Sequence, residues 1–303
     1  MIPLIDFVRV AGAGIRGITF HTGGYMLRKT AHSRAVRLAA LSAAAFLCTI
    51  GGVIAPTGAW AADTAGPETS GAALENVAAE DASLLLSPAT GPGTGITQVG
   101  EGTAAVPATA DVPVSLTGED GAQLDIHLPT ESSPEAAPAA VLGGGTVVYP
   151  GADFSNSVIV GDAGVQMLTT IAGQDSPTAY EYRVSLEEGQ ALESTEGGAA
   201  ILNADGTIAV AIGKAWAKDA KGVDVPTHYE VHGSTLTQIV DHADGSFTYP
   251  VLADPIWLAP WVVRCLIGIG INGATITRIA SSGSPGAVLA AFGYGAFRCI
   301  LGR

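Results

Sequence analysis

The chain has 303 residues and a net charge of −14, and 48% of its residues are hydrophobic but only 6% are aromatic. This composition, rich in glycine and poor in large core residues, argues against one core of 300 residues and favours a smaller core flanked by looser segments. Residues 62–254 contain 27 acidic and four basic residues, so that region would repel phosphates, which excludes nucleic acid as its partner.

The first 61 residues show the pattern of a secretory signal. Basic residues at 28–37 precede an uncharged apolar run at 38–55, and Ala59 and Ala61 occupy the −3 and −1 positions of a cleavage site. We therefore expect an N-terminal signal helix, cleavage after Ala61 and a secreted protein. Met26 is an alternative start, because a more ordinary signal begins there. An uncleaved membrane anchor is the alternative to cleavage, since the apolar run is long for a signal.

Residues 62–110 are rich in alanine, glycine, threonine, proline and glutamate. This composition predicts a disordered acidic linker, in which residues 72–86 could form a short helix.

From residue 111 to 254 the hydrophobic pattern has a period of two. Tyr180, Tyr182 and Val184 alternate with polar residues, and so do apolar residues in 123–129 and 228–233. Asp-Gly turns at 118–121, 203–206 and 242–245 separate such runs, which is typical of hairpins. The sequence therefore predicts a mainly β fold, with a β-sandwich or open-barrel module at 111–254.

Five segments of this module carry a resemblance to a known family: TVVYPG (146–151), YEYRVSL (180–186), AILNADGTIAVAI (200–212), AWAKDAKGVDVPTHYEVHGSTLTQIVDH (215–242) and YPVLADPIW (249–257). Over roughly residues 112–257 the chain resembles uncharacterised secreted actinobacterial proteins. They share an all-β module that ends in Tyr-Pro-Val-x-Ala-Asp-Pro and precedes a variable C-terminal piece. The resemblance implies secretion and a domain boundary, and it implies no activity.

Two patterns resemble sites of known chemistry. His228 and Glu230 are weak candidates for metal ligands, because they would lie about 6.6 Å apart along one face of a strand, whereas His232 would lie about 13 Å from His228. A polar outer face is the alternative. GIGING at 268–273 matches a dinucleotide-binding pattern, but no acidic residue follows to hold a ribose, so close helix packing explains it better. We expect that the protein is not an enzyme and binds no cofactor. A hydrolase or metal enzyme would depend only on the face formed by His228, Glu230 and His232.

The last segment, residues 255–303, has four arginines and no acidic residue. A turn pattern at 281–286 lies midway between Cys265 and Cys299, which predicts two antiparallel helices, at 257–280 and 285–301, with Pro285 in the first turn of the second. Residues equidistant from such a turn face each other, so we expect a Cys265–Cys299 disulfide.

The apolar, cationic character of this hairpin suggests membrane contact. The residues expected at the membrane are Trp257, Trp261, Arg264, Arg278 and Arg298. We expect a secreted, non-enzymatic protein whose acidic β-module carries a membrane-active, bacteriocin- or toxin-like hairpin. Its partners would be an anionic membrane or cell envelope and a protease that cleaves near 252–255. The alternative is a cell-envelope-associated binding or structural module with the hairpin packed as part of its fold.

Overall fold

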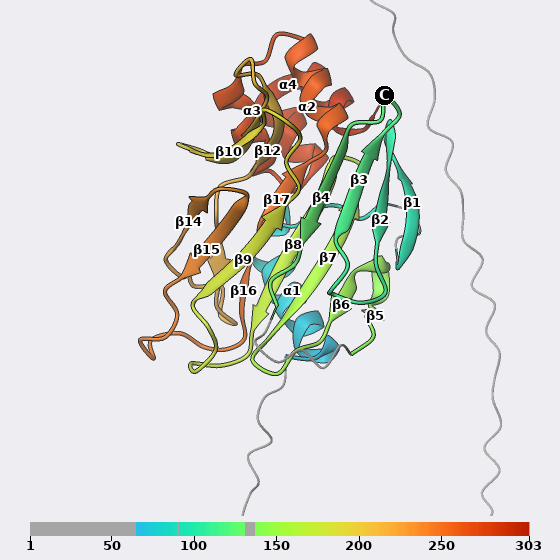
Figure 1. The fold of residues 1–303 in the computed structure, drawn as a ribbon. Coiled ribbons are helices and arrows are strands. Elements are labelled where there is room, and N and C mark those ends of the chain that lie inside the picture. The colour runs from blue at the N-terminus through green and yellow to red at the C-terminus, as the bar shows by residue number, and fades with distance from the viewer. Residues whose placement is uncertain (1–64, 90, 92, 131–136, 303) are drawn as a thin grey trace, which may run out of the picture. The chain divides into compact units, whose positions relative to one another are not determined.

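The computed structural model describes residues 65–89, 91, 93–130 and 137–302 (Figure 1). The expected signal helix, the Met26 start and the cleavage site at Ala59 and Ala61 lie outside these residues. All helices and strands named below belong to one compact unit, Gly58–Arg303.

The fold is mainly β, as predicted, and its described strands form two antiparallel sheets. The smaller sheet has seven strands, in the order β1 (Gly95–Val99), β2 (Gly102–Val106), β3 (Val114–Gly118), β4 (Gln123–His127), β9 (Ala179–Val184), β15 (Thr235–Val240) and β14 (Thr227–His232). The larger sheet has ten, with the path β10 (Ala191–Thr195), β11 (Gly198–Leu202), β12 (Ile208–Ile212), β17 (Ile256–Leu258), β8 (Gly164–Ile171), β7 (Phe154–Gly161), β6 (Val147–Tyr149) and β5 (Ala140–Val141). Beside this path β16 (Val251–Ala253) pairs with β8 and with β13 (Ala217–Lys218).

The two sheets meet through aromatic side chains that the period-two pattern places inward. Tyr180 and Tyr182 on β9 are buried, while Glu181 and Arg183 between and after them are exposed. The ring of Tyr180 lies 5.1 Å from that of Phe154 on β7, and the Tyr182 hydroxyl is 3.0 Å from the Thr169 hydroxyl on β8. The alternating pattern therefore predicted correctly which face of β9 forms the core of the sandwich.

The central strands β7 and β8 are buried on both faces, because a second layer covers the outer face of the larger sheet. This layer consists of α1 (Pro67–Asp81), the short helix η1 (Ala82–Leu84) and the residues after it (Figure 1). The Ser70 hydroxyl lies 2.6 Å from the Ser155 hydroxyl, and Gln166 accepts a hydrogen bond from the Leu86 N–H at 2.7 Å. These bonds explain why polar residues occur in fully buried strands.

Two predicted boundaries differ from the structure. Residues 62–110 were expected as a disordered linker with a possible short helix at 72–86. The helix is present as α1 and η1, and the linker prediction is wrong for β1 and β2, which are ordered strands of the smaller sheet. The segment is poor in large residues, but small side chains such as Ala73 and Val77 pack closely against the sheet. The boundary expected at 254/255 falls between β16 and β17, which both pair with β8, so the β-module continues to Leu258.

The Asp-Gly turns have two different roles. Those at 118–121 and 203–206 close the β3–β4 and β11–β12 hairpins, as predicted. The turn at 242–245 has the same local form, with Gly245 at φ +80°, but it leads from β15 in the smaller sheet to β16 in the larger. An Asp-Gly turn therefore has the same local conformation in a hairpin and in a connection between two sheets, so its sequence does not show whether the next strand pairs with the previous one.

Candidate functional site

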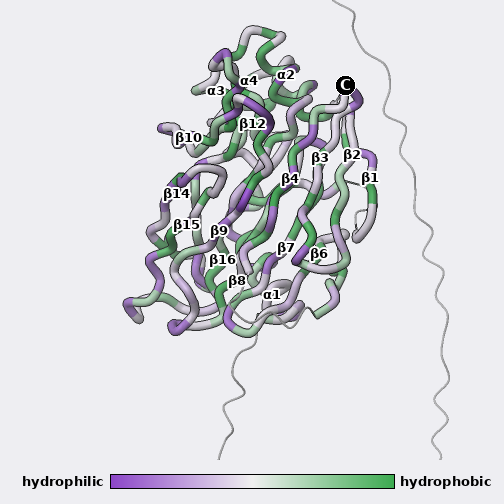
Figure 2. Tube along the Cα trace, viewed as in Figure 1, coloured by the Kyte–Doolittle hydropathy of each residue, from purple (hydrophilic) through white to green (hydrophobic). Residues whose placement is uncertain are grey.

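One end of the sandwich is closed by three helices, α2 (Pro260–Gly268), α3 (Gly273–Ala280) and α4 (Pro285–Ile300). We call residues 260–300 the cap. It packs against β11, β12 and β17 of the larger sheet (Figure 1). Figure 2 shows that hydrophobic residues run through the cap as well as through the strands.

The GIGING segment ends helix α2. The N–H of Gly270 bonds to the Ile267 carbonyl at 2.9 Å, and the N–H of Ile271 bonds to the Leu266 carbonyl at 3.0 Å. This pair of bonds, with Gly270 at φ +86°, is a Schellman motif, in which glycine is favoured because the position is left-handed. The continuous helix expected at 257–280 is therefore wrong: residues 256–258 are a strand, and the helix is interrupted before Asn272 caps α3.

The second helix begins as predicted. Ser284 accepts a hydrogen bond from the Ala287 N–H at 3.2 Å, and Pro285 occupies the first turn. The preceding turn is tied to η1 and to the residues after it, because Gly283 donates to the Ser83 carbonyl at 2.7 Å and accepts from the Ser87 N–H at 3.2 Å. Gly293, at φ +83°, interrupts α4 near its middle.

The Cys265–Cys299 disulfide is confirmed. It joins α2 to the end of α4 with a Cα–Cα distance of 5.5 Å. Both ends of the cap are thus held together covalently, as the position of the turn between the cysteines predicted.

The two tryptophans expected at a membrane are buried in the protein itself. Trp257 lies on β17 with none of its surface exposed, and its ring is 6.3 Å from that of Tyr182. Trp261 packs over β2, where a Cβ added to Gly102 would lie 2.6 Å from the indole ring. Trp257 fills space between the two sheets and Trp261 covers β2, so the expectation of lipid contact for these two residues does not agree with their burial.

The three arginines expected at the membrane are all exposed, but their surroundings differ. Arg264 donates a hydrogen bond to Asp120 in the β3–β4 turn, and this bond lowers the pKa of the Asp120 carboxyl. Arg278 lies over the ring of Phe292, 5.8 Å from its centroid, and Arg298 is in the last turn of α4. Arg264 is therefore tied to the β-module, and all three arginines are exposed on the cap.

The outer side of the cap exposes large apolar side chains that the sequence did not single out. Ile267 is 41% exposed, Ile269 50%, Leu289 42% and Tyr294 67%. Ile269 and α4 are adjacent, because a Cβ added to Gly295 would lie 3.1 Å from Ile269 Cδ1. We call the following exposed, uncharged residues the cap face: Ile267, Gly268, Ile269, Gly270, Leu289, Ala290, Ala291, Gly293, Tyr294 and Gly295.

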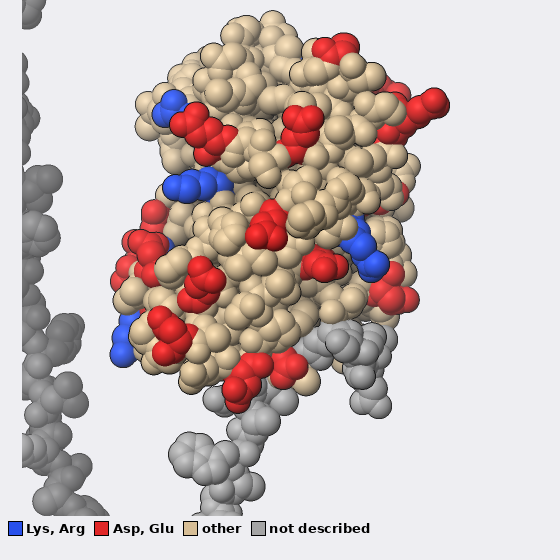
Figure 3. All heavy atoms as spheres, turned by 60° about the vertical axis from the view of Figure 1, so that its left-hand side comes forward, with Lys and Arg blue, Asp and Glu red and all other residues tan. Residues whose placement is uncertain are grey.

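The top of the molecule in Figure 3, where the cap lies, is largely free of charged side chains, with charges scattered around it. An exposed apolar surface with polar surroundings is typical of an interaction site. None of the described helices is long and apolar enough to cross a bilayer.

No protein-family model and no curated protein matches this sequence. The interpretation of the cap face therefore depends on its own chemistry.

The weak metal candidates lie on the exposed face of β14. The Nε2 atoms of His228 and His232 each lie 3.6 Å from a different carboxylate oxygen of Glu230. Among the residues that the structure describes, no group of three or more His, Cys, Asp or Glu side chains is arranged to hold a metal ion. The arrangement is that of a solvated polar face.

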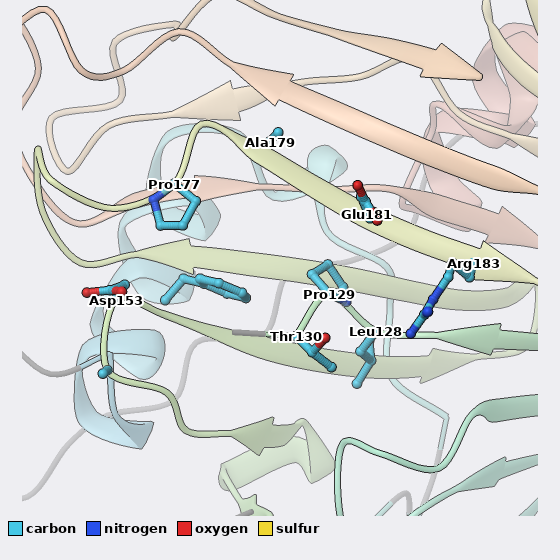
Figure 4. Close-up of a pocket in the computed structure, with 10 residues that line it drawn as sticks. Leu128, Pro129, Thr130, Asp153, Pro177, Ala179, Glu181 and Arg183 are labelled. Carbon is cyan, nitrogen blue, oxygen red and sulfur yellow. The ribbon is translucent and has the colours of Figure 1, made fainter. Parts of the chain in front are cut away.

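A hollow of about 610 Å³ opens between the end of β4, the start of β7 and β9 (Figure 4). Its polar lining includes Thr130, Asp153, Glu181 and Arg183. Its described lining contains no histidine or cysteine, so Thr130 has no histidine beside it to act as a base.

A smaller groove of about 340 Å³ runs along the base of the cap. Leu124, Val210 and Ile267 contribute apolar surface, and the Asp120–Arg264 pair lies at its wall. Ile267 lines this groove and also belongs to the cap face, so the groove adjoins the cap face.

A buried acid predicts how stability depends on pH. Asp254 is 1% exposed, and burial raises the pKa of its carboxyl well above the usual range, although the Trp216 N–H donates to it at 3.1 Å. The folded state therefore keeps a proton that the unfolded chain loses above about pH 4. The stability that Asp254 contributes is complete below that pH and declines as the pH rises towards its folded pKa.

We expect Asp254→Asn to make the free energy of unfolding fall less steeply between about pH 5 and 7, because the amide does not titrate. Urea unfolding at a series of pH values measures this slope. Asp219→Asn is the matched control. Burial opposes ionisation of Asp219, but three backbone N–H bonds outweigh it and lower its pKa. This variant should therefore change how the free energy of unfolding depends on pH below about pH 4, and not between about pH 5 and 7. An unchanged slope in Asp254→Asn would contradict the assignment.

Proposed function

We propose that this protein is a secreted, non-enzymatic binding module of the cell envelope that docks through the cap face. The observation that carries the proposal is the exposure of Ile267, Ile269, Leu289 and Tyr294 on an element that is otherwise built into the fold. The signal-like pattern at 28–61 and the resemblance to secreted actinobacterial proteins support the compartment.

The packing of the cap favours this function over a tail that is released as a membrane-active peptide. Strand β17 lies between β12 and β8, so its removal would break the larger sheet. Residue 254, at the proposed cleavage point, is buried, and a protease would need local unfolding to reach it. These observations favour a hairpin that acts in place, within the folded module.

Fractionation of the producing cells tests the proposal. We expect the wild-type protein in the envelope fraction and Ile267→Ser/Ile269→Ser mainly in the medium, with a shift of about tenfold or more, because two partly exposed aliphatic side chains lose their apolar contact.

The control is Ile96→Ser/Val223→Ser, which removes two exposed aliphatic side chains from the β-module and should stay in the envelope fraction. Retention of both variants to the same degree would show that the cap face is not the docking surface.

A further inference from the structure

We propose that the cap face docks on the interface of an anionic lipid bilayer and inserts Ile267, Ile269 and Tyr294 among the lipids. This inference rests on the docking role proposed above and names the surface that the cap face binds. Three properties of the cap support it: its apolar tip, its internally paired backbone and its charges.

The tip of the cap lies where the end of α2 meets α4. Ile267 and Ile269 stand at the end of α2 with exposed Gly268 and Gly270 beside them, and Tyr294 lies on the neighbouring part of α4. Tyrosine prefers the headgroup level of a membrane, and aliphatic side chains prefer the acyl boundary below it. Because α2 has nine residues, this tip suits the interface and not a span of the bilayer.

Three N–H groups at this tip are paired within the protein. The N–H groups of Ile269, Gly270 and Ile271 bond to the carbonyls of residues 265, 267 and 266 at 3.1, 2.9 and 3.0 Å. An apolar medium offers no replacement partners, so a segment that enters it must pair its own backbone groups. The Schellman motif does this for three N–H groups at the point where the chain turns and the apolar side chains protrude.

The charges of the cap are complementary to lipid phosphates. Residues 255–303 contain four arginines and no acidic residue, whereas residues 62–254 contain 27 acidic and four basic residues. Arg278 and Arg298 are exposed on the cap, and Asp120, which contacts the cap, is paired with Arg264. At physiological salt, acids more than about 8 Å from the lipid surface are largely screened. Arginines close to the phosphates keep most of their attraction.

Flotation with lipid vesicles tests this inference. Residues 62–303 retain every described helix and strand and omit the apolar run at 38–55, which could itself bind lipid. We expect this chain to float with vesicles of phosphatidylcholine and phosphatidylglycerol. Ile267→Ser/Ile269→Ser should lower the partition coefficient by about tenfold or more, and Ile96→Ser/Val223→Ser should leave it unchanged. Equal unfolding midpoints would show that all these variants are folded.

The arginines and the headgroups are tested separately. Arg278→Gln/Arg298→Gln should weaken binding to the anionic vesicles and abolish most of its salt dependence, while binding to phosphatidylcholine alone should change little. In Tyr294→Trp, the added indole should become shielded from an aqueous quencher when anionic vesicles are present. Absence of binding to the anionic vesicles, or equal binding by Ile267→Ser/Ile269→Ser, overturns the proposal.

Failure here is distinguishable from failure of the proposed function. If purified lipid is not bound, but the envelope fraction still holds the wild type and loses Ile267→Ser/Ile269→Ser, the cap face docks on a protein or polymer and the lipid inference is wrong. If the envelope fraction also holds both forms equally, the docking role itself is wrong.

Discussion

Replacing Trp257 by alanine is expected to lower the free energy of unfolding by about 3 to 5 kcal/mol, the range for removing a large aromatic side chain from a core. Trp257 has no exposed surface and lies on β17, between β12 and β8. Its ring is next to Tyr182 of the other sheet, so the cavity would open between the two layers. Urea unfolding followed by circular dichroism measures the change.

Two control variants sharpen this experiment. Trp257→Phe should cost less than alanine, because the Trp257 Nε1 atom has no hydrogen-bond partner among the described residues and no bond would be lost. Tyr294→Ala, on the cap face, should change stability by no more than about 0.5 kcal/mol, as is usual for exposed positions. A Trp257→Ala variant as stable as Tyr294→Ala would contradict the core position of Trp257 and would restore it as a candidate for lipid contact.

Removal of the disulfide is the second large effect. The cysteines are separated by 34 positions in the chain, for which the chain-entropy model predicts a loss of about 4 kcal/mol. Cys265→Ala/Cys299→Ala keeps small side chains at both positions and removes only the covalent link. Without it, α4 is held by apolar contacts such as those of Val288 near its start and Ile300 at its end.

Chemical unfolding with and without a reductant provides the control. Residues 62–303 contain only these two cysteines, so a reductant should destabilise the wild-type segment and leave the double variant unchanged. Equal stability of the oxidised wild type and the double variant would contradict a stabilising role for the link. Loss of lipid binding in a variant that is still folded would show that the disulfide also holds the cap face in shape.

Local patterns predicted a large part of the fold. Alternation in 179–184 identified the inward face of β9, because a strand turns successive side chains to opposite sides. Pro285 marked the start of α4, because its ring is compatible with a first helical turn. The cysteine pairing followed from the position of the turn between them. Each of these properties depends on a few neighbouring residues or on symmetry about one turn.

The errors concern surfaces that distant segments cover. The segment that forms α1 has the composition of a linker, and only the outer face of the larger sheet gives it a place to pack. The boundary at 254/255 was wrong because strand pairing depends on a partner, β8, that lies more than 80 residues earlier. The break before α3 had a local signal in Gly270, but the same glycines also suited close helix packing.

The candidate site shows the same division. The sequence by itself determined that the last segment is apolar, cationic, free of acids and closed by a disulfide, since these are properties of composition and spacing. Only the tertiary structure decided which apolar residues face outward. Trp257 and Trp261 resemble membrane anchors in sequence, but they are buried against β9 and β2 of the smaller sheet. Ile267, Ile269, Leu289 and Tyr294 look like ordinary core residues, but no described element covers them. The hydrophobicity of a side chain shows that it favours leaving water. The packing of strands that are distant in the sequence decides whether the protein itself buries that side chain.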